Sequence, residues 1–447
     1  MKNPLIKLLA VILCLSLLLT GCGDKKKEEQ NQPVSADLPP EEYVGTVTLW
    51  HWDAKSVEVC LEDFNKVYPN IKVEVVGAPG DYVDSLRNSI AGGLELPDMV
   101  MMDTTWRGEL MEWGIFEDLS KEPYSLDTSI FLDYIVPTLY STKGELITVP
   151  WDVGICGLAY NKQAAKKWLG TDDRKELEAM LPTWEAFAQK AAEIQEASDG
   201  KAYMTASAVP MMTIIANQDK SPLVVDHTLQ IEKIKDNLKT MIMLRDAGAF
   251  RALKDQSPGY LASINSTNYI FWHCAPWVVP FTLVAYANKV EDSFGMIVPP
   301  EGPSISGGAG VAIVSRGKTE YQKMLAYKFL EWFLCTEQGA WSQRKNNDFY
   351  IHVKKAYEDP EYVAYGNMLF GQQDLGKIWF NEMVGELMLR PTTEVDRYIY
   401  QSDCHVAQQM AEKKDLTFDE LWPMWAGAYN SNEPDGYMIP KEAYETE

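Results

Sequence analysis

The chain has 447 residues and a formal net charge of −23 at pH 7, from 64 acidic and 41 basic residues. So acidic a chain repels phosphates, which disfavours nucleic acids and other anionic ligands as partners. The length exceeds what one hydrophobic core of about 250–300 residues usually organises, so it predicts two domains.

The N-terminal residues have the pattern of a bacterial secretion signal. Lys2 and Lys7 accompany an apolar run, residues 8–19, that is too short to span a bilayer. The run ends in Leu-Thr-Gly-Cys22, which resembles the lipobox of bacterial lipoproteins, in which the cysteine is acylated and becomes the mature N-terminus. We therefore expect a lipoprotein signal peptide at 1–21, a lipid such as palmitate on Cys22, and anchoring on the extracytoplasmic face of the cell membrane. The alternative is a simple secretory signal with an incidental cysteine.

Residues 22–44 are almost entirely polar and predict a flexible tether. The cysteines beyond Cys22 lie far apart and form no C-x-x-C motif, so we expect no metal site. Their odd number argues against a full disulfide framework and favours buried thiols. These cysteines are Cys60, Cys156, Cys274, Cys335 and Cys404.

The first pattern of the folded part is Thr46-Val-Thr-Leu-Trp-His-Trp-Asp53. Its alternation predicts a strand that ends in two indoles, an imidazole and a carboxylate. Ligands of open α/β sheets bind outside the carboxyl ends of the strands. Trp50, Trp52 and Asp53 are therefore candidate ligand contacts, although aromatics that plug the end of an ordinary core strand would give the same pattern.

Helices and strands then alternate. The spacing of apolar residues predicts a helix over 57–67, a strand over 71–75 and a helix over 82–90, and Met99-Val-Met-Met102 reads as a buried parallel strand. This βαβαβ order is typical of a doubly wound sheet. The buried strand also ends in polar and aromatic residues, so Asp103 and Trp106 become candidates, together with Asp81 before the second helix.

Eight short motifs follow one another along the chain: Val47-Thr-Leu-Trp50, the run over 64–76, Gly92-Gly93 with Pro97-Asp98, Pro150-Trp151-Asp152, Leu158-Ala-Tyr-Asn-Lys162, Pro182-Thr-Trp-Glu185, Gly307-Gly-Ala-Gly310 and the run over 326–335. Their order resembles the family 1 extracellular solute-binding proteins of bacterial ABC importers, the group that includes maltose-binding protein. Each motif alone is common, but eight in the same order are specific.

The resemblance implies an α/β, two-lobe, periplasmic-binding-protein-like (type II) fold with hinge crossings. Lobe I would comprise residues 45–150 and 308–341, and lobe II residues 151–307 and 342–447. The chain would cross between lobes near 150–160, 306–311 and 341–347. The resemblance also implies a monomeric, non-enzymatic protein, without catalytic residues or cofactor, that captures a ligand between its lobes and delivers it to an ABC permease.

The chemistry of the candidates suits a carbohydrate, because sugar rings pack on aromatic faces and sugar hydroxyls bind carboxylates and amides. Members of the family that this sequence resembles usually have a glycine-tryptophan turn here, but no glycine precedes Trp272 or Trp277. The sequence therefore leaves open which of these two indoles faces the cleft. Each carboxylate could instead cap a helix or a turn. The candidates are Trp50, Trp52, Asp53, Asp81, Asp103, Trp106, Trp151, Asp152, Trp272, Trp277 and Gly308.

Two other functions stay open. A surface-anchored glycoside hydrolase would use two of these carboxylates, about 5 to 9.5 Å apart, on the glycosidic bond. The same fold could instead bind a polyamine or another cation, which the acidic balance favours. Trp184 and Trp332 lie in helical patterns and are expected in the core.

Overall fold

The computed structural model describes residues 38–77, 82–432 and 436–444, apart from the side chain of Tyr82. The expected signal peptide, the expected lipid site at Cys22, most of the tether and the candidate Asp81 lie outside these ranges. No described helix is both long and apolar enough to cross a membrane.

The first of two large sheets has the strand order β2-β1-β3-β12-β4. β1 (Gly45–His51) runs parallel to β2 (Ile71–Gly77) and β3 (Met99–Asp103), as the βαβαβ pattern predicts, and β12 (Ala309–Ile313) runs antiparallel to β3 and β4 (Val149–Pro150). Val47 and Leu49 alternate with more exposed neighbours, whereas residues 99–102 are buried throughout. Both burial patterns confirm the sequence interpretation.

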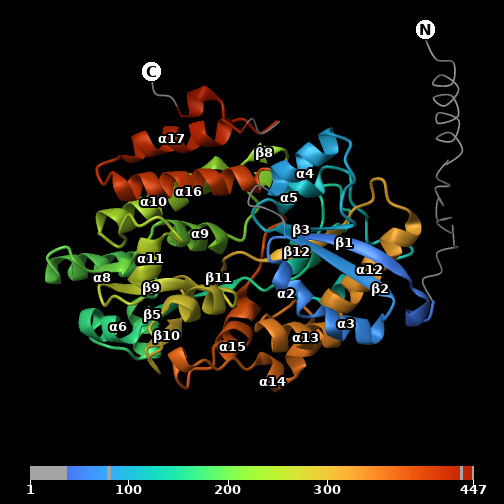
Figure 1. The fold of residues 1–447 in the computed structure, drawn as a ribbon. Helices are drawn as coiled ribbons and strands as arrows, with labels where there is room; N and C mark the ends of the chain where they lie inside the picture. The colour runs from blue at the N-terminus through green and yellow to red at the C-terminus, as the bar shows by residue number, and fades with distance from the viewer. Residues whose placement is uncertain (1–37, 78–81, 433–435, 445–447) are drawn as a thin grey trace, which may run out of the picture. The chain divides into compact units, whose positions relative to one another are not determined.

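Helices pack around this sheet, and in Figure 1 the orange α12 and α13 lie beside the blue β1 and β2. The predicted helix over 57–67 is two helices, because α2 ends before Val59 and α3 begins at Leu61. The helical segments here are η1 (Pro40–Glu42), α2 (Ala54–Glu58), α3 (Leu61–Val67), α4 (Tyr82–Ala91), α5 (Arg107–Met111), η2 (Thr128–Ile130), η3 (Asp133–Thr138), α12 (Glu320–Cys335) and α13 (Glu337–Asn347).

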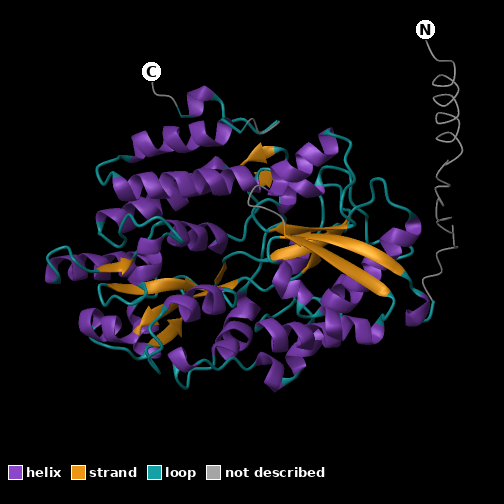
Figure 2. Cartoon of the chain, in the orientation of Figure 1, coloured by secondary structure: helices purple, strands orange, loops and turns teal. Residues whose placement is uncertain are grey.

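The second sheet has the strand order β10-β5-β9-β6. β5 (Ile155–Asn161) pairs antiparallel with β10 (Phe294–Ile297), β9 (Tyr269–Cys274) and β11 (Ser304–Ile305), and β6 (Tyr203–Thr205) is parallel to β9. Every residue of β5 is buried, because helices cover the sheet, as Figure 2 shows. A short hairpin, β7 (Val224–Val225) and β8 (Thr228–Leu229), lies apart from both sheets.

Sequence capping signals set several helix starts. Thr183 caps α8, accepting a hydrogen bond from the Ala186 N–H at 3.2 Å, and Thr417 and Glu420 form a capping box at the start of α17. The Thr393 hydroxyl donates a hydrogen bond to Asp396 at 2.8 Å. Because α16 begins only at Asp396, this pair precedes the helix and does not cap it.

The remaining helices are α6 (Lys162–Leu169), α7 (Arg174–Met180), α8 (Trp184–Ala197), α9 (Val209–Gln218), α10 (Ile231–Asp246), α11 (Pro258–Ser263), η4 (Val279–Val284), η5 (Lys354–Glu358), α14 (Pro360–Val363), η6 (Met368–Phe370), α15 (Leu375–Lys377), η7 (Ile378–Met383), η8 (Val384–Glu386), α16 (Asp396–Glu412), α17 (Phe418–Asn430) and η9 (Lys441–Ala443). In Figure 1 the red α16 and α17 lie alongside α10, and α16 packs on α9, which in turn contacts β9 of the second sheet.

Two segments connect the sheets. The chain passes from β4 to β5 through residues 151–154 and returns from β11 to β12 through residues 306–308. Glycine is required here, because a Cβ on Gly154 would lie 2.5 Å from the carbonyl oxygen of Gly307, whose own φ is +70°. We propose 150/151 and 307/308 as lobe boundaries. α13 packs against α2 and α12, and η7 further along the chain packs against β5. We therefore propose that the third crossing follows Asn347 and does not lie within residues 341–347, as the sequence suggested.

Candidate ligand-binding site

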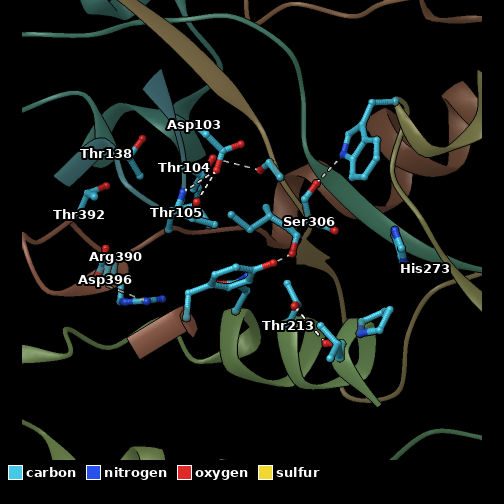
Figure 3. Close-up of a pocket in the computed structure, with 18 of the residues that line it drawn as sticks. Asp103, Thr104, Thr105, Thr138, Thr213, His273, Ser306, Arg390, Thr392 and Asp396 are labelled. Carbon is cyan, nitrogen blue, oxygen red and sulfur yellow. Dashed lines mark hydrogen bonds and ion pairs between the residues drawn. The ribbon is translucent and has the colours of Figure 1, made fainter. Parts of the chain in front are cut away.

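A cavity of about 310 Å³ lies where the loop after β3, the return crossing, α9 and the C-terminal segment meet (Figure 3). Both lobes therefore contribute to its wall. The residues that line it are Asp103, Thr104, Thr105, Thr138, Val209, Pro210, Thr213, Asn217, Asp255, His273, Trp277, Ile305, Ser306, Gly307, Leu389, Arg390, Thr392, Asp396 and Tyr400.

The first lobe contributes the loop that follows β3. The Oδ1 atom of Asp103 accepts hydrogen bonds from the Thr105 N–H at 2.9 Å and from its hydroxyl at 2.7 Å. The Thr104 N–H donates to the carbonyl oxygen of Gly308 at 2.9 Å, and the Thr104 hydroxyl also donates to carbonyl oxygens of the return crossing. The loop is thereby fixed against the crossing, with the Asp103 carboxylate in the cavity wall.

The second lobe contributes one tryptophan and one face of α9. Trp277 donates its indole N–H to the carbonyl oxygen of Ser306 at 2.8 Å, which leaves the flat faces of the ring for packing. The amide of Asn217 on α9 donates to the carbonyl oxygen of Ile305 at 3.2 Å. The crossing is thus held from both sides by residues that also line the cavity.

His273 is buried and Asp255 half-buried in another part of the wall. Burial lowers the pKa of His273, against the opposing effect of Asp255. Burial also raises the pKa of Asp255, against the opposing effect of His273. The Oδ1 atom of Asp255 has no hydrogen-bond partner among the described residues, which leaves a buried acceptor unsatisfied.

The C-terminal segment supplies a pair of opposite charges. Arg390 lies 3.9 Å from Asp396, measured between Nη2 and Oδ1, and Asp396 also accepts hydrogen bonds from the Thr393 hydroxyl and N–H at 2.8 and 3.1 Å. The Nε atom of Arg390 is a buried donor without a partner in the described part of the chain. In Figure 3 this pair stands on the side of the cavity away from His273.

A fully buried guanidinium lies below the first-lobe wall. Burial lowers the pKa of Arg107 to about 10, while Asp103 and Asp152 oppose that shift, so the group stays cationic. Its Nη1 atom donates to the Thr138 hydroxyl at 3.0 Å. The carboxylates of this wall therefore have a compensating charge.

The structure brings a few of the candidate residues to the cavity. Asp103 and Trp277 line it, and Gly308, with φ +107°, lies directly behind Thr104. Of the two tryptophans between which the sequence could not choose, Trp277 lines the cavity. Trp272 is 1% exposed and donates a hydrogen bond to the Ser263 hydroxyl at 3.3 Å inside the second lobe.

Trp151 and Asp152 serve the crossing itself. Trp151 is 2% exposed, donates to the Gln343 side chain and packs against His51 with ring centroids 4.3 Å apart. Asp152 accepts the Ala309 N–H at 2.7 Å, and burial raises its pKa to about 6. The expectation that these side chains face a ligand does not fit their burial, and we assign them a structural role.

The end of β1 is also used for packing. Asp53 caps α2 by accepting hydrogen bonds from the N–H and the hydroxyl of Ser56, which is the alternative that the sequence left open. Trp50 and Trp106 are partly buried against the hydrophobic core of the first lobe. Trp52 is 54% exposed and lies 6.3 Å from Phe281 between ring centroids, but it does not line the cavity.

Sequence reasoning missed most of the polar wall. His273 follows Trp272 in a strand that is buried on both faces, so alternation could not show which of the two faces a cavity. Arg390, Thr392, Asp396 and Tyr400 come from the tail, where no motif signalled a site. No three His, Cys, Asp or Glu side chains in the described ranges gather as a metal site would require.

The two sheets, their two crossings and the cavity between them define a two-lobe, periplasmic-binding-protein-like fold. Residues 60–369 match the bacterial extracellular solute-binding proteins, and the chain belongs to that family. The resemblance drawn from the motifs is therefore confirmed, and the family implies an extracytoplasmic location. Its members are binding proteins and not enzymes. No curated protein matches the chain significantly.

Solved structures share the fold at low sequence identity. An extracellular solute-binding protein of family 1 matches with a TM-score of 0.76 at 16% identity, over 86% of this chain and 99% of its own. The sugar-binding protein MalE from Xanthomonas citri gives 0.68 at 18% identity, over 87% and 98%. The ABC substrate-binding protein from Listeria monocytogenes in complex with cycloalternan gives 0.66 at 18% identity, over 88% and 99%.

Proposed function

We propose that this protein captures a carbohydrate in the cavity and delivers it to an ABC permease. The observation that carries the proposal is the mixture of groups in the wall. Asp103 and Asp255 offer acceptors, Arg390 offers donors, and Trp277 and Tyr400 offer flat aromatic surfaces. Sugar hydroxyls both donate and accept, so a sugar can satisfy both kinds of group while its ring packs on an aromatic face.

The charge of the wall supports a neutral ligand over a polyamine. Arg107 compensates Asp103, and Arg390 lies beside Asp396. The acidic excess of the chain is thus not concentrated in the cavity. A polyammonium ligand donates only, so it would leave the donors of Arg390 unsatisfied and face its positive charge.

The known ligands of structural relatives point in the same direction. MalE from Xanthomonas citri is a sugar-binding protein, and the relative from Listeria monocytogenes binds cycloalternan. Their identity to this chain is low, so they support the class of ligand and not a particular sugar.

We propose further that a lipid on Cys22 holds the protein, as a monomer, at the outer face of the membrane near its permease. The support is the sequence Leu19-Thr-Gly-Cys22 directly after an apolar run. Cys22→Ser should release the protein from membranes or stall its processing. A variant that matures fully and stays membrane-bound would rule out the anchor.

Calorimetric titration with neutral mono- and oligosaccharides, and separately with spermidine, tests the ligand class. We expect heat and a raised melting temperature with a sugar and none with spermidine. Chromatography of the same mixtures detects hydrolysis, and product formation would favour a glycoside hydrolase. Binding of spermidine alone would overturn the carbohydrate proposal.

A further inference from the structure

The wall of the cavity includes a segment that lies beyond the part of the chain matched by the family. The match ends at residue 369, whereas Leu389, Arg390, Thr392, Asp396 and Tyr400 all line the cavity. We call residues 387–400 the C-terminal wall. The central family region therefore does not set the dimensions of the site by itself.

The C-terminal wall is fixed to the first lobe. The Leu389 N–H donates to the carbonyl oxygen of Tyr134 at 3.4 Å, and Arg397 pairs with Glu109 on α5 at 3.0 Å. α5 approaches the wall so closely that a Cβ on Gly108 would lie 2.0 Å from the carbonyl oxygen of Thr393.

The second lobe holds both ends of the same segment. Just before the wall, Lys220 donates to the carbonyl oxygen of Glu386 at 2.6 Å. Just after it, α16 packs along α9 of the second lobe. A segment tied to both lobes is a fixed boundary for whatever occupies the cavity.

The volume and the aromatic surfaces both indicate a short ligand. The cavity volume of about 310 Å³ lies at the lower end of the roughly 300–1,000 Å³ that small-molecule sites span. Among the residues that line it, Trp277 and Tyr400 are the large aromatics on which a sugar ring could pack. Two such surfaces match one or two rings, and a longer chain that extends toward Arg390 would meet the C-terminal wall.

We propose that the C-terminal wall is the specificity determinant that limits the ligand to a mono- or disaccharide, with Arg390 as the side chain that closes the cavity on that side. The proposal rests on the carbohydrate-binding function proposed above. Arg390 is held beside Asp396, and Asp396 is held by Thr393, so the guanidinium has a defined place in the wall.

Titration of the full mature chain with sugars of increasing length tests the limit. The probes are the one- to four-ring members of the gluco, galacto and xylo series: glucose to maltotetraose, galactose to β-1,6-galactotetraose and xylose to xylotetraose. We expect the best one- or two-ring probe to bind at least tenfold more tightly than the four-ring member of its series. Equal or tighter binding of the four-ring member overturns the length limit alone, whereas no binding in any series overturns the carbohydrate function and the limit with it.

Arg390→Ala tests the residue assignment, because it shortens the wall without touching Asp103 or Trp277. The preference for the short probe over the four-ring probe should fall at least tenfold. Arg316→Ala is the matched control, since Arg316 is exposed and does not line the cavity. An unchanged length preference in folded Arg390→Ala, verified by its melting temperature, overturns the role of Arg390.

Discussion

The ends of β1 and β3 look alike in sequence and serve different purposes. Both buried strands run into an aspartate and tryptophans, yet Asp53 caps α2 while Asp103 lines the cavity. The difference comes from what packs against each strand end. β12 pairs with β3 and brings Gly307 beside it, whereas the end of β1 is covered by Trp151, which packs on His51. Neighbours that are distant in sequence decide which carboxylate can meet a ligand.

The tryptophans repeat this contrast. Trp151 has its indole N–H bonded to Gln343 and its ring buried against His51 and Phe333, while Trp277 keeps ring surface in the cavity wall. The first should therefore matter for folding and the second for binding.

The largest effect is expected for Trp151→Ala. Removing a fully buried indole should lower the free energy of unfolding by about 3–5 kcal/mol, because it leaves a cavity against His51 and an unsatisfied Gln343. Urea unfolding followed by circular dichroism measures this loss. Trp52→Ala is the control, since Trp52 is exposed and should cost far less. A loss for Trp151→Ala no larger than for Trp52→Ala would place Trp151 outside the core.

Asp152 should impose a pH dependence on stability. Its pKa in the folded protein is about 6 against an ordinary value of 3.8, so between these values the folded state binds more protons than the unfolded state. Stability due to this group therefore falls as pH rises from about 4 to about 6, by about 3 kcal/mol in total, and the whole cost is present above pH 6.

Asp152→Asn should remove that slope, because the amide cannot ionise and its oxygen can still accept the Ala309 N–H. Between pH 4 and pH 7, the free energy of unfolding of the variant should rise relative to that of the wild type as the pH increases. Asp415→Asn, at an exposed position, is the control. Parallel curves for wild type and Asp152→Asn would show that Asp152 does not titrate in this window.

The sequence predicts the strands of the first sheet and the family well, because alternation and buried apolar runs are local signals and the family motifs keep their order along the chain. It predicts the site poorly. His273 and Arg390 reach the cavity through the pairing of β9 and the course of the tail, and Asp255 through the loop between α10 and α11. None of these leaves a local pattern in the sequence. Asp103, predicted from its place at the end of a strand, does line the cavity, whereas Trp272 is buried inside the second lobe because both faces of its strand are covered.

Trp277→Ala should weaken sugar binding by about 1–3 kcal/mol, because it removes a face on which a ring packs. Stability should change less than for Trp151→Ala, since the Trp277 ring is only partly buried. Calorimetric titration and urea unfolding of both variants give the comparison directly. Loss of folding in Trp277→Ala, with binding lost in a stable Trp151→Ala, would mean that their roles are exchanged.

The smallest change in stability is expected for a substitution at the end of β1, which we compare with the same substitution at the end of β3. Asp53→Ala removes the cap of α2 and should lower stability by about 1 kcal/mol, with sugar affinity unchanged, because Asp53 does not line the cavity. Asp103→Ala is the matched substitution at the other strand end and should reduce affinity instead, through the loss of a charged acceptor for ligand hydroxyls. Each variant is measured by titration and by unfolding, so that both readouts exist for both positions. If Asp53→Ala weakens sugar binding as much as Asp103→Ala, the end of β1 contacts the ligand after all, and the cavity extends toward Trp52.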